Sequence, residues 1–392
     1  MKLLHRYILT ELLKVFTILV SALTVLLTFV GAMQQIRESG LGPVQVLQIL
    51  PWVVPSLLPF TIPATFLLTV CVVYGRMAGD QEVTAAKAAG INVFSILWPS
   101  FLLGAVLSVF SFLMTDQVIP LSVRQIQKTI TSAMEDIFLE RLKAQGQLTG
   151  WAHGLEITVM GVENKRLLRP SVRYAPKGRE ALIVQAREGT VEFNLEQEQV
   201  ILHLEHVPAD IPGRGVVWLE HEDYPFPLPS KMRRTKVRHM SLSTIRKELA
   251  EVRQKRVRVQ ERQAIEAAIV LVTGEFDTFF SPRFRKYDTD LEVSEARDAR
   301  FRTEIHSRFA LAASCLFFVL LGSPFSILQA RRQFLTNFLL VFLPILLCYY
   351  PVLLLMMNLS KTGTVNPAYA MWTSNLLVLT MAWFVLRRVF RH

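Results

Sequence analysis

Residues 74–92, YGRMAGDQEVTAAKAAGIN, carry a few charges on a short alanine-rich stretch between two apolar runs. Asp80 and Glu82 stand near its start and Lys87 stands toward its end. Acidic residues at the cap and in the first turn, with a basic residue near the last turn, predict a helix over residues 81–89 in which Asp80 is the cap. The chemistry open to Glu82 is a charge-assisted hydrogen bond to an arginine of another protein.

The predicted helix is about nine residues long, which is too short to span a membrane or to be stable alone. Gly90 suits its end. Ala85 and Ala86, with two further alanines behind them, give it a thin body that can fit closely into a groove. A helix lying on lipid headgroups would be richer in Lys, Trp, Phe and Leu, so contact with a protein is favoured over an ordinary surface helix.

The residue types needed for metal binding, disulfides or nucleotide binding are present only in unsuitable patterns. His203 and His206 are three apart, so alternation along a strand puts them on opposite faces and argues against a metal site. Cys71, Cys315 and Cys348 fall in apolar runs and predict buried small side chains. The chain has no G-x-x-x-x-G-K-[ST] motif. We therefore predict no catalytic residue, cofactor or metal, and any ATP hydrolysis would belong to a partner chain.

Apolar runs dominate the two ends of the chain. Six of them lack Asp, Glu, Lys and Arg and approach the ~20 residues that a spanning helix needs. They are Val15–Met33, Val53–Gly75, Val93–Thr115, Phe309–Gln329, Thr336–Ser360 and Ala368–Leu386. These runs predict an α-helical membrane protein with six transmembrane helices, and their lack of ionisable groups argues against an ion-coupled carrier.

The segment that enters the second run has prolines at four-residue spacing, at Pro51, Pro55, Pro59 and Pro63. Each proline frees the carbonyl four residues before it. Freed carbonyls are tolerated in a membrane only against protein or in a wet cavity. We therefore expect a bent entry into this span that faces protein rather than lipid.

The polar block between the third and fourth runs, residues 116–308, divides into two patterns. Residues 155–220 alternate as half-buried strands do, with Phe193, Leu202 and Leu204 among the apolar positions. They predict an antiparallel β domain, of sandwich or jelly-roll-like form, whose interior is either a slot for acyl chains or a closed core.

From Ser241 the pattern becomes that of one long, charged helix leading back toward the membrane. The segment 231–262 holds twelve basic and three acidic residues. An anionic neighbour and a solvated helix face are both compatible with this charge.

Lysine and arginine in the short loops predict the orientation. One side of the membrane carries ten of them and the other carries only Arg37 and Lys361. Both termini and the loop 76–92 are therefore expected in the cytoplasm, with residues 116–308 outside it.

Several stretches, in order along almost the whole chain, resemble the lipopolysaccharide export permeases of the LptF/LptG family. They are HRYILTELLK, YGRMAGDQEVTAAKAAGI, TEIHSRFALA, LLGSPFSILQARR, YYPVLLLMMNLSKTG and PAYAMWTSNLL. The resemblance implies a permease subunit of an ABC transporter in the bacterial inner membrane, with three spans in 1–115, an outer β jelly roll with a charged helical segment in 116–308, and three spans in 309–392.

The same resemblance implies the partners and the substrate path. A second LptF/LptG-type subunit would pair with this one, an LptB-type ATPase dimer would contact the coupling helix through Glu82, and LptC/LptA-type bridge proteins would receive the lipopolysaccharide. The family often has basic residues after the first span for substrate phosphates; here Gln34 and Gln35 occupy that region and Arg37 remains. The rival functions are a secondary lipid carrier and a membrane-anchored scaffold or sensor, and co-purification with a soluble ATPase would separate them.

Overall fold

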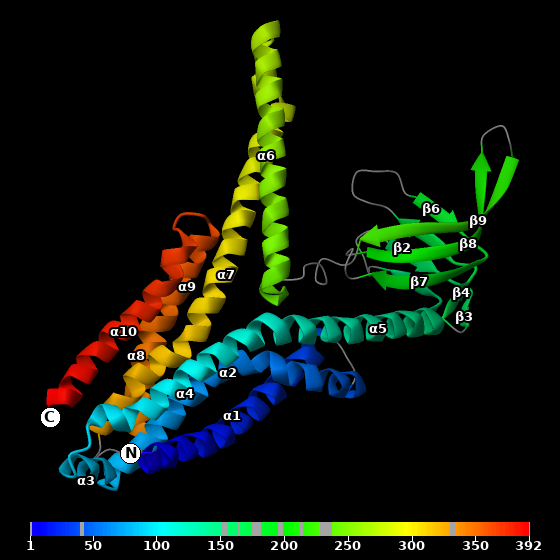
Figure 1. The fold of residues 1–392 in the computed structure, drawn as a ribbon. Helices are drawn as coiled ribbons and strands as arrows, with labels where there is room; N and C mark the ends of the chain where they lie inside the picture. Colours follow the sequence, from blue (N-terminus) through cyan, green and yellow to red (C-terminus); the bar gives the residue numbers. More distant parts are fainter. Residues whose placement is uncertain are drawn as a thin grey trace. The chain divides into compact units, whose positions relative to one another are not determined.

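The structure is a computed structural model, and it describes residues 2–39, 43–149, 155–163, 165–174, 182–194, 199–211, 215–227, 237–329 and 334–391. The α-helices are α1 (Lys2–Ser39), α2 (Pro43–Gly79), α3 (Glu82–Ala88), α4 (Val93–Leu113), α5 (Ile119–Gln145), α6 (Leu242–Thr273), α7 (Pro282–Leu328), α8 (Phe334–Pro344), α9 (Tyr350–Lys361) and α10 (Pro367–Arg391) (Figure 1). Two π-helical turns, η1 (Met114–Val118) and η4 (Ile345–Tyr349), join α4 to α5 and α8 to α9. Two 3-10 turns are η2 (Val237–His239) and η3 (Phe276–Phe280).

The strands form two antiparallel sheets. They are β1 (Gln147–Thr149), β2 (Leu155–Thr158), β3 (Gly161–Glu163), β4 (Arg166–Leu168), β5 (Ser171–Tyr174), β6 (Leu182–Gln185), β7 (Glu188–Asn194), β8 (Gln199–Ile211) and β9 (Gly215–Pro227). One sheet has the order β1-β2-β5-β6 and the other β3-β4-β7-β8-β9. Together with six helices of the described chain that are long and apolar enough to cross a membrane, they confirm the predicted fold class.

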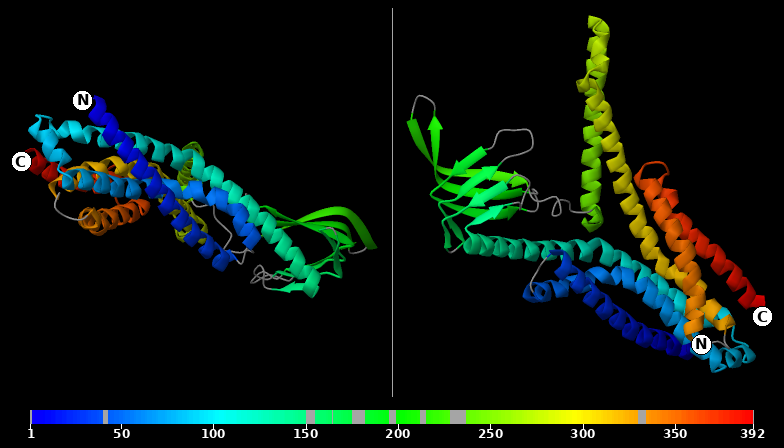
Figure 2. Two further views of the ribbon diagram at one scale, coloured as in Figure 1. Left: turned by 90° about the horizontal axis from the view of Figure 1, so that it is seen from below. Right: turned by 180° about the vertical axis from the view of Figure 1, so that it is seen from behind.

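The chain divides into two compact units. The helical unit comprises Met1–Gly31, Val53–Ser122 and Val237–His392, and the β unit comprises Ala32–Trp52 and Val123–Lys236. In the helical unit α7 is central, since it packs along α4, α6 and α10 (Figure 2). Gly322 permits its close approach to α2, because a Cβ there would lie 2.7 Å from Leu67 Cδ1.

The proline-rich segment of α2 faces protein where its carbonyl is freed. Pro63 removes the helical donor to the Pro59 carbonyl. That carbonyl instead accepts a hydrogen bond from the Ser111 hydroxyl of α4 at 3.4 Å, and Pro59, Pro63 and Ser111 are all buried. The third span therefore supplies the missing partner to the second.

The helix of the third span does not end where its apolar run ends. It continues from α4 through η1 into α5, as far as Gln145. Within the β unit, Phe138, Leu139 and Leu142 of α5 belong to the same buried core as the strands. The apolar spacing i, i+1, i+4 on α5 places these three side chains on one face, so the β unit uses the helix to cover part of its interior.

The alternation predicted for the strands is present in the register. Val200, Leu202 and Leu204 of β8 are each at most 2% exposed, and Val191 lies opposite Leu202 on β7. The chain passes from one sheet into the other at three corners: between β2 and β3, between β4 and β5 at Arg169–Pro170, and between β6 and β7. The corners are joined by backbone hydrogen bonds, including Arg169 N–H to the Arg187 carbonyl at 2.9 Å.

The predicted charged helix is confirmed as α6, but its predicted direction is wrong. It begins beside Asp116 and Arg308 at the ends of the third and fourth spans and runs antiparallel to the first half of α7, which is the helix that leads back to the fourth span (Figure 2). The cap of α6 is Ser241, whose hydroxyl accepts from Thr244 N–H at 3.3 Å, and Gly274 ends it at φ 75°. Ion pairs such as Arg253–Asp298 (2.9 Å) cross between the two helices, and Ile245, Leu249, Val252 and Phe301 form the buried seam. Residues 231–236 of the basic segment lie outside the described residues.

His203 lies between two carboxylates on the exposed side of the β7–β9 sheet. Its Nδ1 is 2.6 Å from Asp223 and its Nε2 is 3.3 Å from Glu192. Partial burial lowers the pKa of His203, but hydrogen bonds to and the charges of Asp223 and Glu192 outweigh it, so the net pKa is raised. The carboxylates approach opposite ring nitrogens, and no group of His, Cys, Asp and Glu among the described residues could hold a metal ion.

The raised pKa of His203 predicts that the protection of β7–β9 against amide hydrogen exchange depends on pH. A raised folded-state pKa means that the stabilisation is fully present below the unfolded pKa of about 6.5 and is lost as the pH rises through the folded value. Amide exchange of β7–β9 in the full chain should therefore be slower in the wild type than in His203→Gln at pH 5.5, with intrinsic rates corrected, and equal at pH 9. The same difference at both pH values would contradict the assignment.

Candidate functional site

The loop between the second and third spans contains a helix, α3 (Glu82–Ala88), but its N-terminus differs from the prediction. Asp80 is not the cap: the cap residue is Gln81, at φ 62° and with no side-chain cap hydrogen bond. The reason is that α2 runs to Gly79, and Asp80 N–H still bonds the Arg76 carbonyl at 2.8 Å. Asp80 therefore closes the preceding helix, and the chain reverses at Gln81.

The end of α3 follows the prediction. Gly90 has φ 78° and its N–H bonds the Lys87 carbonyl at 2.9 Å, while Ile91 N–H bonds the Ala86 carbonyl at 3.0 Å. These two bonds are a Schellman motif, which satisfies carbonyls that the last helical turn leaves free. The motif directs the chain straight from α3 into α4.

Side-chain contacts hold α3 against the first helix. Val83 is 4% exposed and belongs to the core of the helical unit. Tyr7 of α1 donates to Glu82 at 3.4 Å, and Arg76 of α2 pairs with Glu11 of α1 at 3.0 Å. His5 of α1 is 2.9 Å from the Ser95 hydroxyl in α4. The short helix thus contacts α1 directly and is continuous through short turns with α2 and α4, and these three long helices are joined to one another by the other two contacts.

The surface that α3 leaves free is made of small side chains. Asp80, Thr84, Ala85, Ala88 and Ala89 are exposed. Glu82, Ala86 and Lys87 are half-buried. Of the predicted contact residues, the structure brings Glu82, Ala85, Ala86 and Lys87 together on one short helix, with Asp80 just before it. A helix with this surface can fit into a groove with its backbone close to the partner.

A second polar cluster lies at the other end of the third span. Arg308 of α7, 2% exposed, is 3.6 Å from Asp116 Oδ1 and 3.3 Å from Glu304 Oε1. Its Nη2 donates to the carbonyls of Arg238 (3.2 Å) and Met240 (2.7 Å). The Asp116 carboxylate also accepts from Leu242 N–H at 2.6 Å, at the first position of α6. We call Arg308, Asp116 and Glu304, with the backbone they bind, the arginine clasp.

The arginine clasp joins three elements by charge. Asp116 lies in the π-helical turn η1, where an extra residue in the turn alters the direction of its side chain. Its carboxylate satisfies a free amide at the positive end of α6. Arg308 then neutralises the carboxylates and binds the chain that enters α6. The cluster fixes where α6 begins relative to the third and fourth spans.

Sequence reasoning missed this cluster, because each of its main residues lies one position outside a predicted span. Thr115 ends one charge-free run and Asp116 follows, while Arg308 precedes Phe309. The two positions are on the same side of the membrane, since one span ends there and the next begins there. Opposite charges directly beside two such neighbouring ends are the signal that would have found the pair.

The predicted substrate-path residues all fall in the unit that comprises Ala32–Trp52 and Val123–Lys236. Gln34 and Arg37 lie on α1, but their side chains are outside the described part of the structure, as is that of Phe193 on β7. Leu202 and Leu204 of β8 are 0% and 1% exposed in the core of the β unit. In this conformation both leucines belong to a closed interior.

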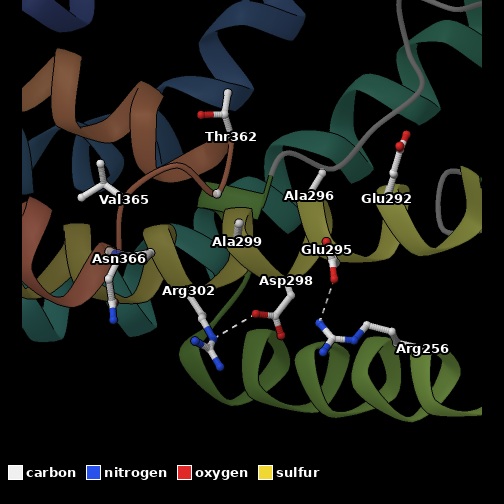
Figure 3. A pocket seen from close by; sticks show the side chains of 12 residues that line it. Arg256, Glu292, Glu295, Ala296, Asp298, Ala299, Arg302, Thr362, Val365 and Asn366 are labelled. Carbon is white, nitrogen blue, oxygen red and sulfur yellow. Dashed lines mark ion pairs between the residues drawn. The ribbon is translucent and has the colours of Figure 1, made fainter. Parts of the chain in front are cut away.

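A cavity of about 570 Å³ lies where α6 and α7 meet the turn between α9 and α10 (Figure 3). Arg256 faces Glu295 at 3.7 Å, and Arg302 faces Asp298 at 2.9 Å. Its two guanidinium groups are thus paired with carboxylates of α7, and Glu292 adds a third carboxylate to the lining. The charges of this lining therefore do not favour an anion.

Six apolar helices interrupted by a two-sheet domain define a multi-pass membrane protein whose polar clusters lie at the ends of its spans. The family described as "Lipopolysaccharide export system permease LptF/LptG" matches residues 6–388, and the chain belongs to this family. A comparison with curated proteins gives no match. The family is one of lipopolysaccharide export permeases, and its members are transporter subunits rather than enzymes.

Proposed function

We propose that the chain is the permease subunit of an ABC transporter that extracts lipopolysaccharide, or a related glycolipid, from the inner membrane. A separate, LptB-type ATPase dimer would supply the energy, a second LptF/LptG-type subunit would complete the cavity, and LptC/LptA-type proteins would receive the glycolipid. The observation that carries the proposal is α3: a short helix attached to three long helices and exposing small side chains.

α3 has the properties that a coupling helix needs. An ATPase in another chain can transmit its conformational change to the membrane helices only through a rigid contact element. Val83 is buried, the Arg76–Glu11 ion pair joins α2, which leads into α3, to α1, and the Schellman motif fixes the turn from α3 into α4. In this proposal Glu82, Ala85, Ala86 and Lys87 contact the ATPase.

The test of the proposal is co-purification. The chain, tagged and extracted in mild detergent from its own cells, should retain a soluble P-loop ATPase and a second permease subunit. Reconstituted with them, it should release glycolipid only when ATP is hydrolysed. Glycolipid transport without the ATPase would favour a secondary carrier, and partner binding with no transport would favour a scaffold.

The orientation belongs to the same proposal, with both termini and α3 in the cytoplasm and the β unit in the periplasm. In a background with Cys71, Cys315 and Cys348 replaced by alanine, a membrane-impermeant maleimide should label Glu163→Cys on intact cells. Lys87→Cys should be labelled only after the inner membrane is permeabilised. Labelling of Lys87→Cys on cells with a closed inner membrane would reverse the orientation.

The β unit would pass the acyl chains along its interior. Leu202 and Leu204 are buried there, so the sheets would have to separate when a chain enters. Photo-crosslinkers at Leu202 and Leu204 should capture glycolipid during ATP-driven transport and not without ATP. Adducts to protein alone under both conditions would favour a permanently closed core.

A further inference from the structure

A second cavity, on the β unit, differs from the one at α6 and α7 in its charge. It has a volume of about 730 Å³. It is lined by Thr158, Val159, Met160, Arg169, Pro170, Ser171, Gln185, Ala186, Arg187, His206 and Pro208. Two arginines and a histidine are in its wall, and the lining contains no aspartate or glutamate among the described residues. We call it the corner cavity.

Two of the three basic side chains come from neighbouring corners between strands, and the third comes from the adjoining strand β8. Arg169 lies between β4 and β5, Arg187 lies between β6 and β7, and His206 lies within β8. Backbone hydrogen bonds join the two corners and β8 in sequence: Arg169 N–H to the Arg187 carbonyl at 2.9 Å, and Arg187 N–H to the Glu205 carbonyl at 3.1 Å. The bonds hold the backbones of Arg169 and Arg187 side by side, with β8 next to them.

Two of these residues have left-handed backbones. Arg169 has φ 48° and His206 has φ 55°. Glycine adopts this conformation freely, whereas a residue with a side chain adopts it only at an energetic cost. At both positions a basic side chain stands where glycine would be less strained, and both side chains line the corner cavity.

The arginines of the corner cavity lack the carboxylate partners that neighbouring arginines have. Arg166 pairs with Glu188 at 3.2 Å and Arg173 pairs with Glu156 at 3.6 Å. Among the described residues, the guanidinium of Arg169 contacts only Met160, with its Nη1 3.9 Å from Met160 Sδ, and the guanidinium of Arg187 has no ion pair. Two positive charges on one wall without internal neutralisation favour an anionic ligand.

The rest of the wall is apolar. Val159, Pro170 and Ala186 are buried at its base, while Met160 is 78% exposed beside Arg169 and Pro208 is exposed beside His206. A ligand that carries an anion next to a sugar or methylene surface would match both parts. The volume is in the range of small-molecule sites, about 300–1,000 Å³, and so suits a headgroup better than an extended acidic peptide.

We propose that the corner cavity binds a phosphate group of the transported glycolipid on the outer face of the β unit. This inference rests on the proposed function and names a part of the substrate that the β unit would recognise. Arg169 and Arg187 would hold the phosphate through their paired N–H donors, and Ser171 and Gln185 can add hydrogen bonds. Met160 and Pro208 would contact the apolar surface next to the phosphate.

The experiment compares two double variants of the full chain in detergent. Arg169→Gln/Arg187→Gln changes the corner cavity, and Arg166→Gln/Arg173→Gln removes the same charge from paired arginines of the same unit. The probes are bisphosphorylated lipid A, its dephosphorylated form and inorganic phosphate, with binding measured by thermophoresis. The cavity variant should bind bisphosphorylated lipid A about tenfold more weakly than the wild type, and the control variant within about twofold.

Three results would overturn the assignment: wild-type affinity in the cavity variant, an equal loss in the control variant, or binding of inorganic phosphate as tight as that of lipid A. Photo-crosslinks from Pro208 only to protein would instead identify a protein ligand and also overturn it. If the cavity variant unfolds at a lower temperature than the wild type, the single variant Arg187→Gln is used instead, because Arg187 does not have a left-handed backbone. It should still bind bisphosphorylated lipid A about threefold more weakly than the wild type. A wild type that binds no phosphorylated glycolipid would refute the proposed function itself, whereas intact binding by the cavity variant refutes only this site.

Discussion

Replacing Glu82 by arginine is expected to separate ATP hydrolysis from transport while the chain still inserts into the membrane. Glu82 is in the first turn of α3, where the helix dipole favours its ionised form and its carboxylate can meet an arginine of the ATPase. Removing one partner of a partly buried ion pair costs a few kcal/mol, roughly 3, and reversing the charge adds repulsion. We expect retention of the ATPase to fall at least tenfold, with Glu82→Ala less severe.

The structure offers a rival local role for Glu82 and a control for it. The Tyr7 hydroxyl donates to the two carboxylate oxygens at 3.4 and 3.5 Å, which is at the long end of hydrogen-bond geometry. Tyr7→Phe removes this contact and keeps the carboxylate, so it should leave coupling unchanged. If Glu82 served only its own helix, Tyr7→Phe and Glu82→Ala would have the same small effect.

The measurement is pull-down of the ATPase together with stimulated hydrolysis and glycolipid release in proteoliposomes. Wild type, Tyr7→Phe, Glu82→Gln and Glu82→Arg are compared at equal amounts of inserted protein. Full coupling in Glu82→Arg would remove α3 from the role of motor contact.

The apolar runs predicted the six spans because a membrane imposes a length and a composition that can be read from single residues. They could not predict how far a helix continues beyond the membrane. The helix of the third span passes Thr115 and continues through α5 to Gln145. In that segment, Phe138 and Leu142 are buried by the β unit, and this packing depends on strands that follow later in the chain.

One end of α3 could be predicted from the local sequence and the other could not. The backbone at position 90 is left-handed, a conformation that glycine adopts freely, so Gly90 alone predicted the C-terminus. Aspartate is also a favoured cap residue, yet Asp80 N–H bonds the Arg76 carbonyl and so ends α2 instead of capping α3. The local sequence does not determine which of the two consecutive helices Asp80 belongs to, because that depends on how the last turn of α2 packs.

The candidate site was predictable only in part for a similar reason. The exposed alanines of α3 follow from composition, but the contacts of Glu82 with Tyr7 and of Arg76 with Glu11 join residues more than 60 positions apart. The left-handed backbones of Arg169, between β4 and β5, and of His206, within β8, depend on the pairing of strands that are distant in the chain. Arginine does not signal such a backbone in advance, and histidine, although enriched there, adopts it at few of its positions.

Replacing Arg308 by methionine is expected to loosen the start of α6 and to lower the stability of the helical unit. Arg308 is 2% exposed, and its loss leaves Asp116 and Glu304 with uncompensated charge and the Met240 carbonyl without its donor. Breaking a buried pair by removing one partner typically costs about 3–5 kcal/mol. The matched control is Arg297→Met, which breaks an exposed pair with Glu248 (3.2 Å) and should cost at most about 1 kcal/mol.

The second half of this prediction concerns Asp116, which neutralises Arg308 and also accepts a hydrogen bond from Leu242 N–H, the first N–H of α6. Asp116→Asn should speed amide exchange at Leu242, because the N–H bonded to the carboxylate at 2.6 Å loses a charged acceptor. Because the two residues share one interaction, Arg308→Met/Asp116→Asn should destabilise by less than the sum of the single variants. Thermal unfolding in detergent gives the stabilities, and hydrogen exchange over residues 237–245 gives the local effect. Strictly additive costs, or exchange at Leu242 that neither substitution changes, would show that the arginine clasp does not determine where α6 begins.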